Sequence, residues 1–169
     1  MGTFHLERNL ALKIFLGSDH AGFKLKEDIK KFLDKLGYEY EDIGAYSNES
    51  SSDYPKTAFK LADKVAKTDG KGILMCGTGT GEAIAANKVK GIRAANCFNE
   101  YTARMSREHN DSNVLCLGAR VLNKKLAEKI TKIWLETDFS NEARHIRRLR
   151  QIENIEKKFQ PERLKFFSN

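Results

Sequence analysis

A cysteine followed by a glycine-rich turn is the part of this sequence best suited to chemistry. Cys76 opens the run Cys-Gly-Thr-Gly-Thr-Gly-Glu, which ends at Glu82. Such a turn presents backbone N–H groups to an anion, and a thiol near the start of a helix ionises more easily and can act as a base or nucleophile. The run matches neither the GxGxxG of a dinucleotide site nor the GK[ST] of a P-loop. A tight turn beside a buried, inert thiol would explain the same residues.

Other polar residues with possible roles follow predicted strands or lie in a basic segment. Asp19 and His20 come after the first strand, and His109 ends a predicted helix. Each has an ordinary structural explanation, as a helix cap or as a partner of the helix dipole. Arg144 and Arg148 are four residues apart, so on a helix they share a face and could hold a phosphate together. A run of charges is more often a solvated helix face.

Short aliphatic runs alternate with helical patterns, and these elements must position the candidate residues. The predicted strands lie at residues 12–16, 38–43, 72–76, 92–97 and 113–117, and the predicted helices lie at residues 25–36, 59–66, 83–89, 101–108, 126–135 and 146–159. Strands that are apolar on both faces and alternate with helices predict an α/β fold: a three-layer α/β/α sandwich around a five-stranded parallel sheet. Ligands bind at the carboxyl ends of such strands, so we expect the candidates to gather there.

Composition fits one globular domain. The 169 residues are 40% hydrophobic and 31% charged, which excludes disorder and fibres. We expect a domain over residues 12–159 with tails at 1–11 and 160–169. Cys76, Cys97 and Cys116 form no CxxC pair, so neither disulfides nor a metal site is predicted. Free thiols, the lack of a signal peptide and the lack of an apolar run of roughly 20 residues indicate a cytoplasmic protein without a membrane partner.

Positive charge is concentrated at the C-terminus. The formal net charge is +7, and residues 144–169 contribute eight basic and three acidic side chains. A nucleic acid, an acidic membrane surface or a phosphorylated small molecule could use such a cluster. Stacking on single-stranded nucleic acid needs aromatic residues among the basic ones, but Phe159, Phe166 and Phe167 all lie beyond the arginines. We therefore expect no nucleic-acid partner.

Five motifs in order resemble the ribose-5-phosphate isomerase B family, which includes subunits of galactose-6-phosphate isomerase and allose-6-phosphate isomerase. They are Ser-Asp-His-Ala-Gly at 18–22, Cys-Gly-Thr-Gly-Thr-Gly at 76–81 with Ile-Ala-Ala-Asn-Lys at 84–88, Ser-Arg-Glu-His-Asn-Asp at 106–111, Gly-Ala-Arg at 118–120, and Arg-His at 144–145 with Arg148. The resemblance implies a Rossmann-like sandwich that interconverts ribose 5-phosphate and ribulose 5-phosphate through an enediolate. It also implies no metal or cofactor, and a homodimer or homotetramer with active sites shared across the interface.

The resemblance assigns roles to individual residues. Cys76 would be the proton-transfer base and His109 the acid that opens the sugar ring. Thr78 and the amides of the loop would face the developing oxyanion. Substrate contacts would come from Asp19, which is also a catalytic candidate, and from His20, Gly77, Thr78, Gly79, Thr80, Gly81, Asn110, Arg120, Arg144 and Arg148.

Two positions depart from the family's pattern. Glu82 stands where many cysteine-type members have an apolar or small residue, and in another branch a glutamate here replaces the cysteine as base. Residues 140–143 read Ser-Asn-Glu-Ala, not the Gly-Gly often found before the Arg-His pair. We expect Cys76 to be the base, because the helix dipole should lower the pKa of Glu82. The opposite assignment stays open, as do a hexose 6-phosphate substrate and a non-catalytic phosphate-ligand or nucleic-acid-binding module.

Overall fold

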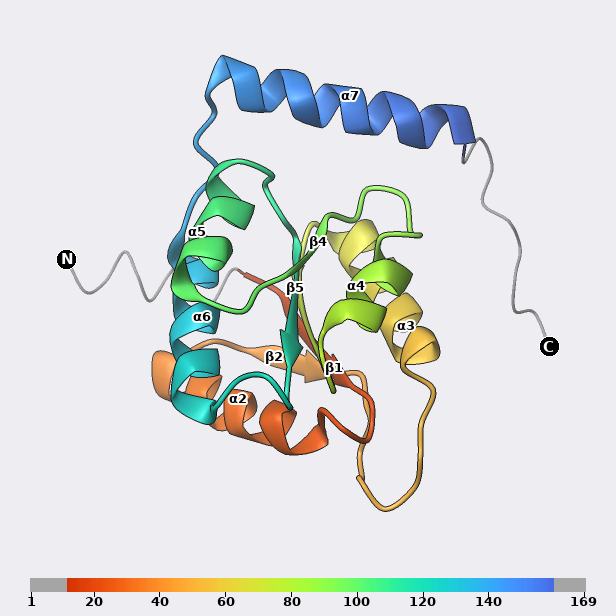
Figure 1. Cartoon of the computed structure of the whole chain (residues 1–169), viewed down its shortest axis with the longest axis vertical. Coiled ribbons are helices and arrows are strands. Elements are labelled where there is room, and N and C mark those ends of the chain that lie inside the picture. The colour runs from red at the N-terminus through yellow and green to blue at the C-terminus, as the bar shows by residue number, and fades with distance from the viewer. Residues whose placement is uncertain (1–11, 160–169) are drawn as a thin grey trace.

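A parallel sheet forms the centre of the molecule in the computed structural model, which describes residues 12–159 (Figure 1). Its strands are β1 (Ile14–Ser18), β2 (Tyr40–Asp42), β3 (Lys71–Cys76), β4 (Ala94–Asn96) and β5 (Val114–Gly118). They are arranged in the order β2-β1-β3-β5-β4. The predicted five-stranded parallel sheet is confirmed, and the two edge strands are shorter than the sequence pattern indicates.

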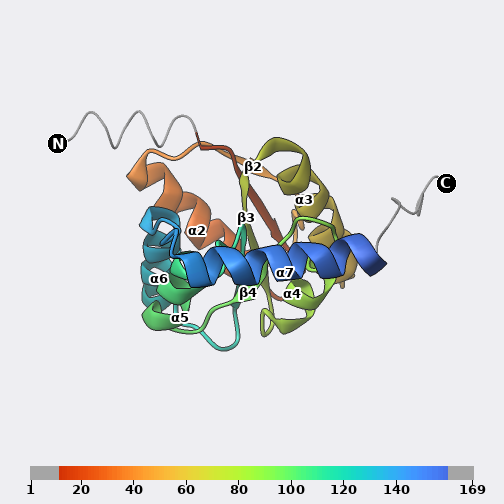
Figure 2. The same ribbon diagram turned by 90° about the horizontal axis from the view of Figure 1, so that it is seen from above.

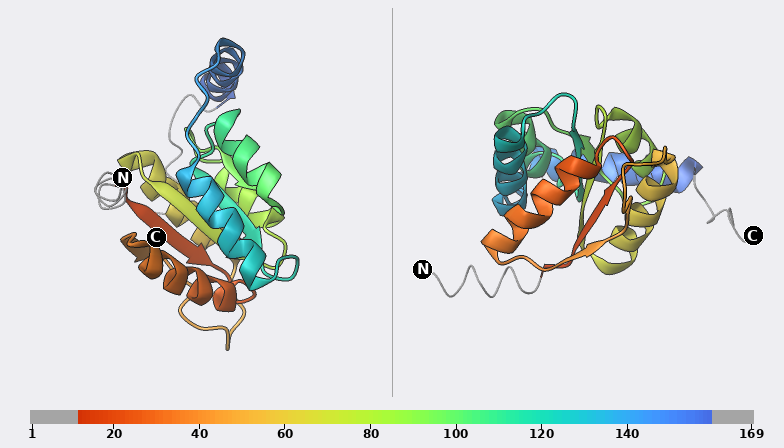
Figure 3. Two further views of the ribbon diagram at one scale, coloured as in Figure 1. Left: turned by 90° about the vertical axis from the view of Figure 1, so that its left-hand side faces the viewer. Right: turned by 90° about the horizontal axis from the view of Figure 1, so that it is seen from below.

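Helices cover both faces of the sheet (Figure 3). One layer contains α2 (Phe23–Leu36), α5 (Glu100–Glu108) and α6 (Lys124–Glu136), and the other contains α3 (Tyr54–Thr68) and α4 (Thr80–Ala86). Side chains that alternate along a strand enter opposite cores. Ile14 and Leu16 of β1 face the first layer, whereas Phe15 between them packs with α3. The predicted α/β/α sandwich is therefore confirmed.

The last helix, α7 (Ala143–Phe159), lies outside these layers and crosses the edge of the sheet where the strands begin (Figures 1 and 2). His145 is its only buried residue. Ile152, Ile155 and Phe159 are 40%, 59% and 71% exposed, so most of the predicted apolar stripe is uncovered within one chain. Glu156 accepts a hydrogen bond from the Gly91 N–H at 3.2 Å and ties the helix to the loop before β4.

Both predicted tails, residues 1–11 and 160–169, lie outside the residues that the structure describes. Within residues 12–159 no helix is both long enough and apolar enough to cross a lipid bilayer.

Candidate active site

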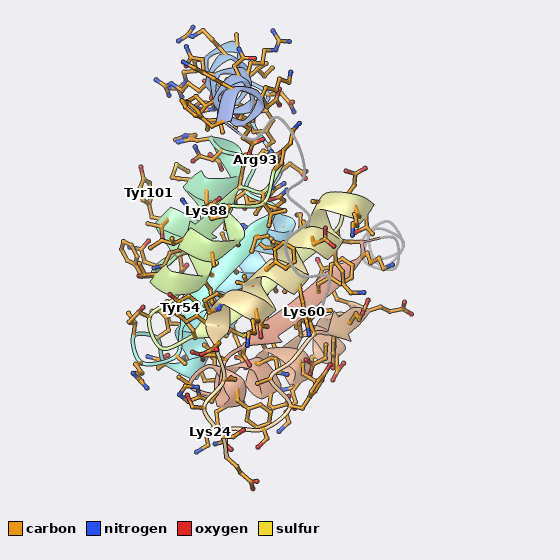
Figure 4. The ribbon with its side chains drawn as sticks, turned by 90° about the vertical axis from the view of Figure 1, so that its right-hand side faces the viewer. Lys24, Tyr54, Lys60, Lys88, Arg93 and Tyr101 are labelled. Atoms are coloured by element: carbon orange, nitrogen blue, oxygen red, sulfur yellow. The ribbon has the colours of Figure 1, made fainter. Side chains whose placement is uncertain are left out.

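The candidate residues form two groups at opposite edges of the sheet. At the carboxyl edge are Asp19, His20, residues 76–82 and Arg120, each just after a strand. At the amino edge are His109 and Asn110 after α5, and Arg144 and Arg148 in α7. Figure 4 shows this separation. Tyr54 lies beside the first group, and Arg93 lies near α7 at the other end of the strands. The expectation that His109 and Asn110 lie at the carboxyl ends is therefore wrong within one chain, because α5 runs back along the sheet before it reaches His109.

Cys76 is the last residue of β3 and is 5% exposed. The Gly79 N–H points at its sulfur, with 3.1 Å between the nitrogen and Sγ. Burial raises the pKa of the Cys76 thiol, and the neighbouring Glu82 carboxyl raises it further, whereas the amides of Thr78, Gly79 and Glu82 lower it. The expected lowering of this pKa is wrong, since the loss of solvation outweighs the amides.

Glu82, in the first turn of α4, is 0% exposed. Neither carboxyl oxygen has a hydrogen-bond partner among the described residues. Burial raises the pKa of Glu82 well above its ordinary value, and the Asp19 carboxylate raises it further, while the Cys76 thiol acts in the opposite direction. The expectation that the helix dipole lowers this pKa is also wrong, because desolvation is the largest effect.

Asp19 and His20 are fixed by the turn between β1 and α2. Asp19 is 7% exposed, and one of its carboxyl oxygens accepts the Gly22 N–H at 2.9 Å. A Cβ atom on Gly22 would lie 1.8 Å from the Met75 carbonyl oxygen, so only glycine lets this turn pack directly on the end of β3. The close packing keeps the Asp19 carboxylate beside the thiol loop.

The sequence gives no sign of the residue that orients His20. The His20 N–H donates to Ser52 Oγ at 2.9 Å, and the Ser52 N–H donates to His20 Nδ1 at 3.2 Å. Because Nδ1 accepts this bond, neutral His20 carries its proton on Nε2 and can donate it to a ligand. Lys26 fixes the start of the same loop, since its buried Nζ binds Asp42 at 2.6 Å and the Ala45 carbonyl oxygen at 2.6 Å.

The glycine-rich loop is held by residues from neighbouring elements. Gly79 has a φ of +79°, and Asn96 at the end of β4 donates to the Thr78 carbonyl oxygen at 3.3 Å and to Thr80 Oγ1 at 3.1 Å. A Cβ on Gly81 would lie 2.8 Å from the ring of Tyr54. Neither Asn96 nor Tyr54 is a candidate from the sequence alone, although the place of Asn96 at a strand end is a usable signal.

Arg120 supplies an exposed positive charge at this edge. Its N–H donates to the Gly77 carbonyl oxygen at 2.9 Å. Its guanidinium lies over the same glycine, with Nη1 3.4 Å from where a Cβ would stand. The loop amides and this exposed guanidinium together can bind an anionic oxygen.

At the amino edge, His109 packs against a second histidine, with the two rings tilted by 42°. The ring centroids of His109 and His145 are 4.3 Å apart, and His145 Nδ1 shares a hydrogen bond of 2.7 Å with Ser140 Oγ. Burial lowers the pKa of His145, and the positive charges of His109 and Arg144 lower it further. Arg144 itself binds Glu142 at 2.7 Å, and both side chains are exposed.

Two arginines outside the predicted site hold the loop that carries His109 and Asn110. Arg107 is buried, and its Nη1 donates to Asp111 and to the Ser112 carbonyl oxygen, both at 2.7 Å. Arg93 donates to the other oxygen of Asp111 at 2.9 Å. Within residues 12–159 no group of three or more His, Cys, Asp or Glu side chains could hold a metal ion.

This parallel sandwich and its thiol loop place the chain in a known class of isomerase: it belongs to the Ribose/Galactose Isomerase family, whose model matches residues 14–152. It is 46% identical to ribose-5-phosphate isomerase B of Escherichia coli over 86% of this chain and 97% of that protein. It is 43% identical to D-erythrulose-4-phosphate isomerase 2 of Mycolicibacterium smegmatis over 77% of this chain and 88% of that protein. The predicted family is confirmed.

Solved structures agree with this assignment. Ribose-5-phosphate isomerase B of Clostridium thermocellum superimposes with a TM-score of 0.85 and 52% identity, over 88% of this chain and 99% of that one. The enzyme from Mycoplasma genitalium, solved with bound ribulose-5-phosphate, gives a TM-score of 0.84 and 40% identity over the same shares of the two chains. The predicted fold is that of these isomerases.

Proposed function

We propose that this protein interconverts ribose 5-phosphate and ribulose 5-phosphate. The observation that carries the proposal is the thiol loop at the carboxyl edge, where Cys76, Asp19 and Arg120 surround a glycine-rich turn. It belongs to a chain whose relatives include ribose-5-phosphate isomerases, one of them solved with the product sugar bound. An aldose–ketose isomerase needs a base, donors for an oxyanion and a cationic site for the phosphate.

Cys76 would carry the proton between C1 and C2. Glu82 has no exposed surface, whereas Cys76, the last residue of β3, keeps 5% of its surface exposed. The thiolate is therefore the base that a substrate can reach. The Thr78 hydroxyl accepts the Thr80 N–H at 3.4 Å, which leaves its own proton free for the oxyanion. Among residues 77–81, the amides that do not already donate to Cys76 or Thr78 would add further donors.

The remaining groups would come from a second copy of the chain. His109, Asn110, Arg144 and Arg148 lie at the opposite edge of the sheet from Cys76, so one chain alone offers a base without a ring-opening acid or a phosphate clamp. A homodimer, or a homotetramer built from such dimers, would bring the amino edge of one subunit to the carboxyl edge of the other. The exposed apolar face of α7, with Ile152, Ile155 and Phe159, supports such an interface.

The paired histidines His109 and His145 would serve the opening of the sugar ring. His109 is partly exposed, while His145 behind it is buried and anchored to Ser140. His109 would give its proton to the ring oxygen as the C1–O bond breaks. The phosphate would lie between Arg144 and Arg148, which occupy one face of α7 and are both exposed. Free thiols at all three cysteines support a cytoplasmic location for the enzyme.

A coupled isomerase assay tests the proposal. Ribose 5-phosphate, allose 6-phosphate, galactose 6-phosphate and D-erythrulose 4-phosphate are compared at equal concentrations with the folded protein. The highest kcat/KM should belong to ribose 5-phosphate. A higher value for another sugar would change the substrate assignment, and no turnover of any of the four would contradict the proposed activity.

A further inference from the structure

Glu82 is a buried acid that the isomerase reaction described above leaves without a task. The side chain is fully buried, and neither carboxyl oxygen has a partner within the described part of the chain. A buried carboxylate without hydrogen bonds is strongly unfavourable, so a carboxyl group in this place keeps its proton.

Burial and the Asp19 carboxylate favour the protonated state of Glu82, whereas the Cys76 thiol, as a hydrogen-bond donor, favours the ionised state and has the smallest of the three effects on its pKa. Asp19, from the turn after β1, adds negative charge, and the thiols of Cys76 on β3 and Cys116 on β5 bring no positive charge. Of the cations at this edge, Arg120 lies against Gly77 and Lys26 is bound by Asp42. Glu82 therefore stands beside the proposed base as an acid whose proton has no acceptor in the resting state.

We propose that Glu82 is a neutral carboxylic acid that donates a hydrogen bond to the Cys76 thiolate. The inference rests on the proposed function, in which Cys76 is the base. The neutral thiol is a weak acceptor, which fits the unpartnered carboxyl oxygens, but an ionised sulfur accepts strongly. The Gly79 N–H already points at this sulfur from 3.1 Å, so Glu82 would add a second, side-chain donor.

In the proposed reaction Glu82 is a positioning residue: it stabilises the Cys76 thiolate but transfers no proton. The C2–H bond breaks, its proton joins the Cys76 sulfur, and the electron pair enters the enediolate. The hydroxyl proton on O2 passes to O1 of the enediolate, the thiol returns its proton to C1, and the thiolate forms again. Glu82 keeps its own proton throughout and stabilises the sulfur anion before and after each transfer. An ionised Glu82 would instead repel that anion, so the two protonation states predict effects of opposite sign.

Two substitutions of similar size separate these possibilities. Glu82→Gln removes the ionisable proton but keeps a hydrogen-bond donor, whereas Glu82→Leu removes both. The rate of alkylation of Cys76 by iodoacetamide is measured from pH 5 to pH 9 without substrate, by mass spectrometry of the peptide that contains Cys76. Circular dichroism and thermal melting confirm that each variant is folded.

We expect the Leu variant to be alkylated about tenfold more slowly than the wild type at pH 7, because a charge-assisted hydrogen bond is lost. The Gln variant should lie between the two, and kcat for ribose 5-phosphate should fall in the same order. A carbonyl infrared band of a protonated carboxyl group should be present at pH 7 in the wild type and lost in both variants.

Faster alkylation of both variants would overturn the inference, because it would mean that an ionised Glu82 repels the thiolate. Unchanged alkylation with kcat lowered by about 10²–10⁴ in both variants would also overturn it and would make Glu82 the base. Failure of the proposed function would appear in a different measurement, the isomerase assay, in which the wild-type protein would turn over no sugar phosphate. The alkylation order is measured without substrate and does not depend on that result.

Discussion

Mixing two inactive variants tests whether the active site is shared between chains. Cys76→Ala removes the proposed base at the carboxyl edge, and His109→Asn removes the proposed ring-opening acid at the amino edge. Each alone should lower kcat by about 10²–10⁴, as expected for the loss of a general base or acid. In a mixed dimer, one site would contain both substitutions and the other would contain neither. The intact second site should restore activity.

The size of the recovery follows from the symmetry of the dimer. If the chains exchange at random in an equal mixture, about half of the dimers are mixed and each has one intact site of two, so about a quarter of the wild-type specific activity should return. The assay is ribose 5-phosphate turnover after joint refolding, with native mass spectrometry to show that chains have exchanged. A mixture of Cys76→Ala with Asp19→Ala should not recover, because both residues lie at the same edge. Background activity in the first mixture, despite proven exchange, would refute the shared site.

Three further predictions concern binding and stability. Arg148→Ala should raise KM for ribose 5-phosphate about tenfold or more, through the loss of a charge-assisted bond worth roughly 1.5–3 kcal/mol; the exposed neighbour Arg147→Ala is the matched control and should change KM little. Gly22→Ala should lower the free energy of unfolding in urea by more than about 1 kcal/mol, since the new Cβ would overlap the Met75 carbonyl oxygen; an unchanged midpoint would mean that the turn relaxes freely. Because burial lowers the pKa of His145 in the folded protein, the unfolded chain binds more protons below about pH 6.5, so Tm should fall as the pH drops below that value. His145→Gln should make this part of the Tm profile flatter, and an equally steep profile would exclude His145 as the cause.

The fold could be predicted from the sequence because its signals are local. β1, β3 and β5 are buried on both faces, which leaves continuous aliphatic runs that only a sheet covered on both sides explains. Gly37, with a φ of +74°, ends α2 at the predicted position. The thiol loop and the turn after β1 were also predictable, since both follow a buried strand.

The site was predicted less completely because its remaining features are not local. Ser52 contacts His20 across 32 residues, and Asn96 contacts Thr78 across 18 residues. Hydrophobic periodicity in the sequence does not predict contacts between residues so far apart along the chain. His109 ends a helix as predicted, but α5 runs back along the sheet, so this end lies at the amino edge. The pKa shifts of Cys76 and Glu82 have the opposite sign from those expected, since burial depends on tertiary packing and not on spacing along the chain.

The short segment that leads into α3 has a consequence for how the proposed substrate site can change. Ser52 meets the turn after β1 and Tyr54, two residues later, covers the turn after β3. Lys26 fixes the other end of this segment through Asp42 and Ala45. A single inserted or deleted residue between these anchors would therefore shift the walls on both sides of the thiol at once. The length of this loop can alter the size of sugar that fits while every catalytic side chain keeps its identity.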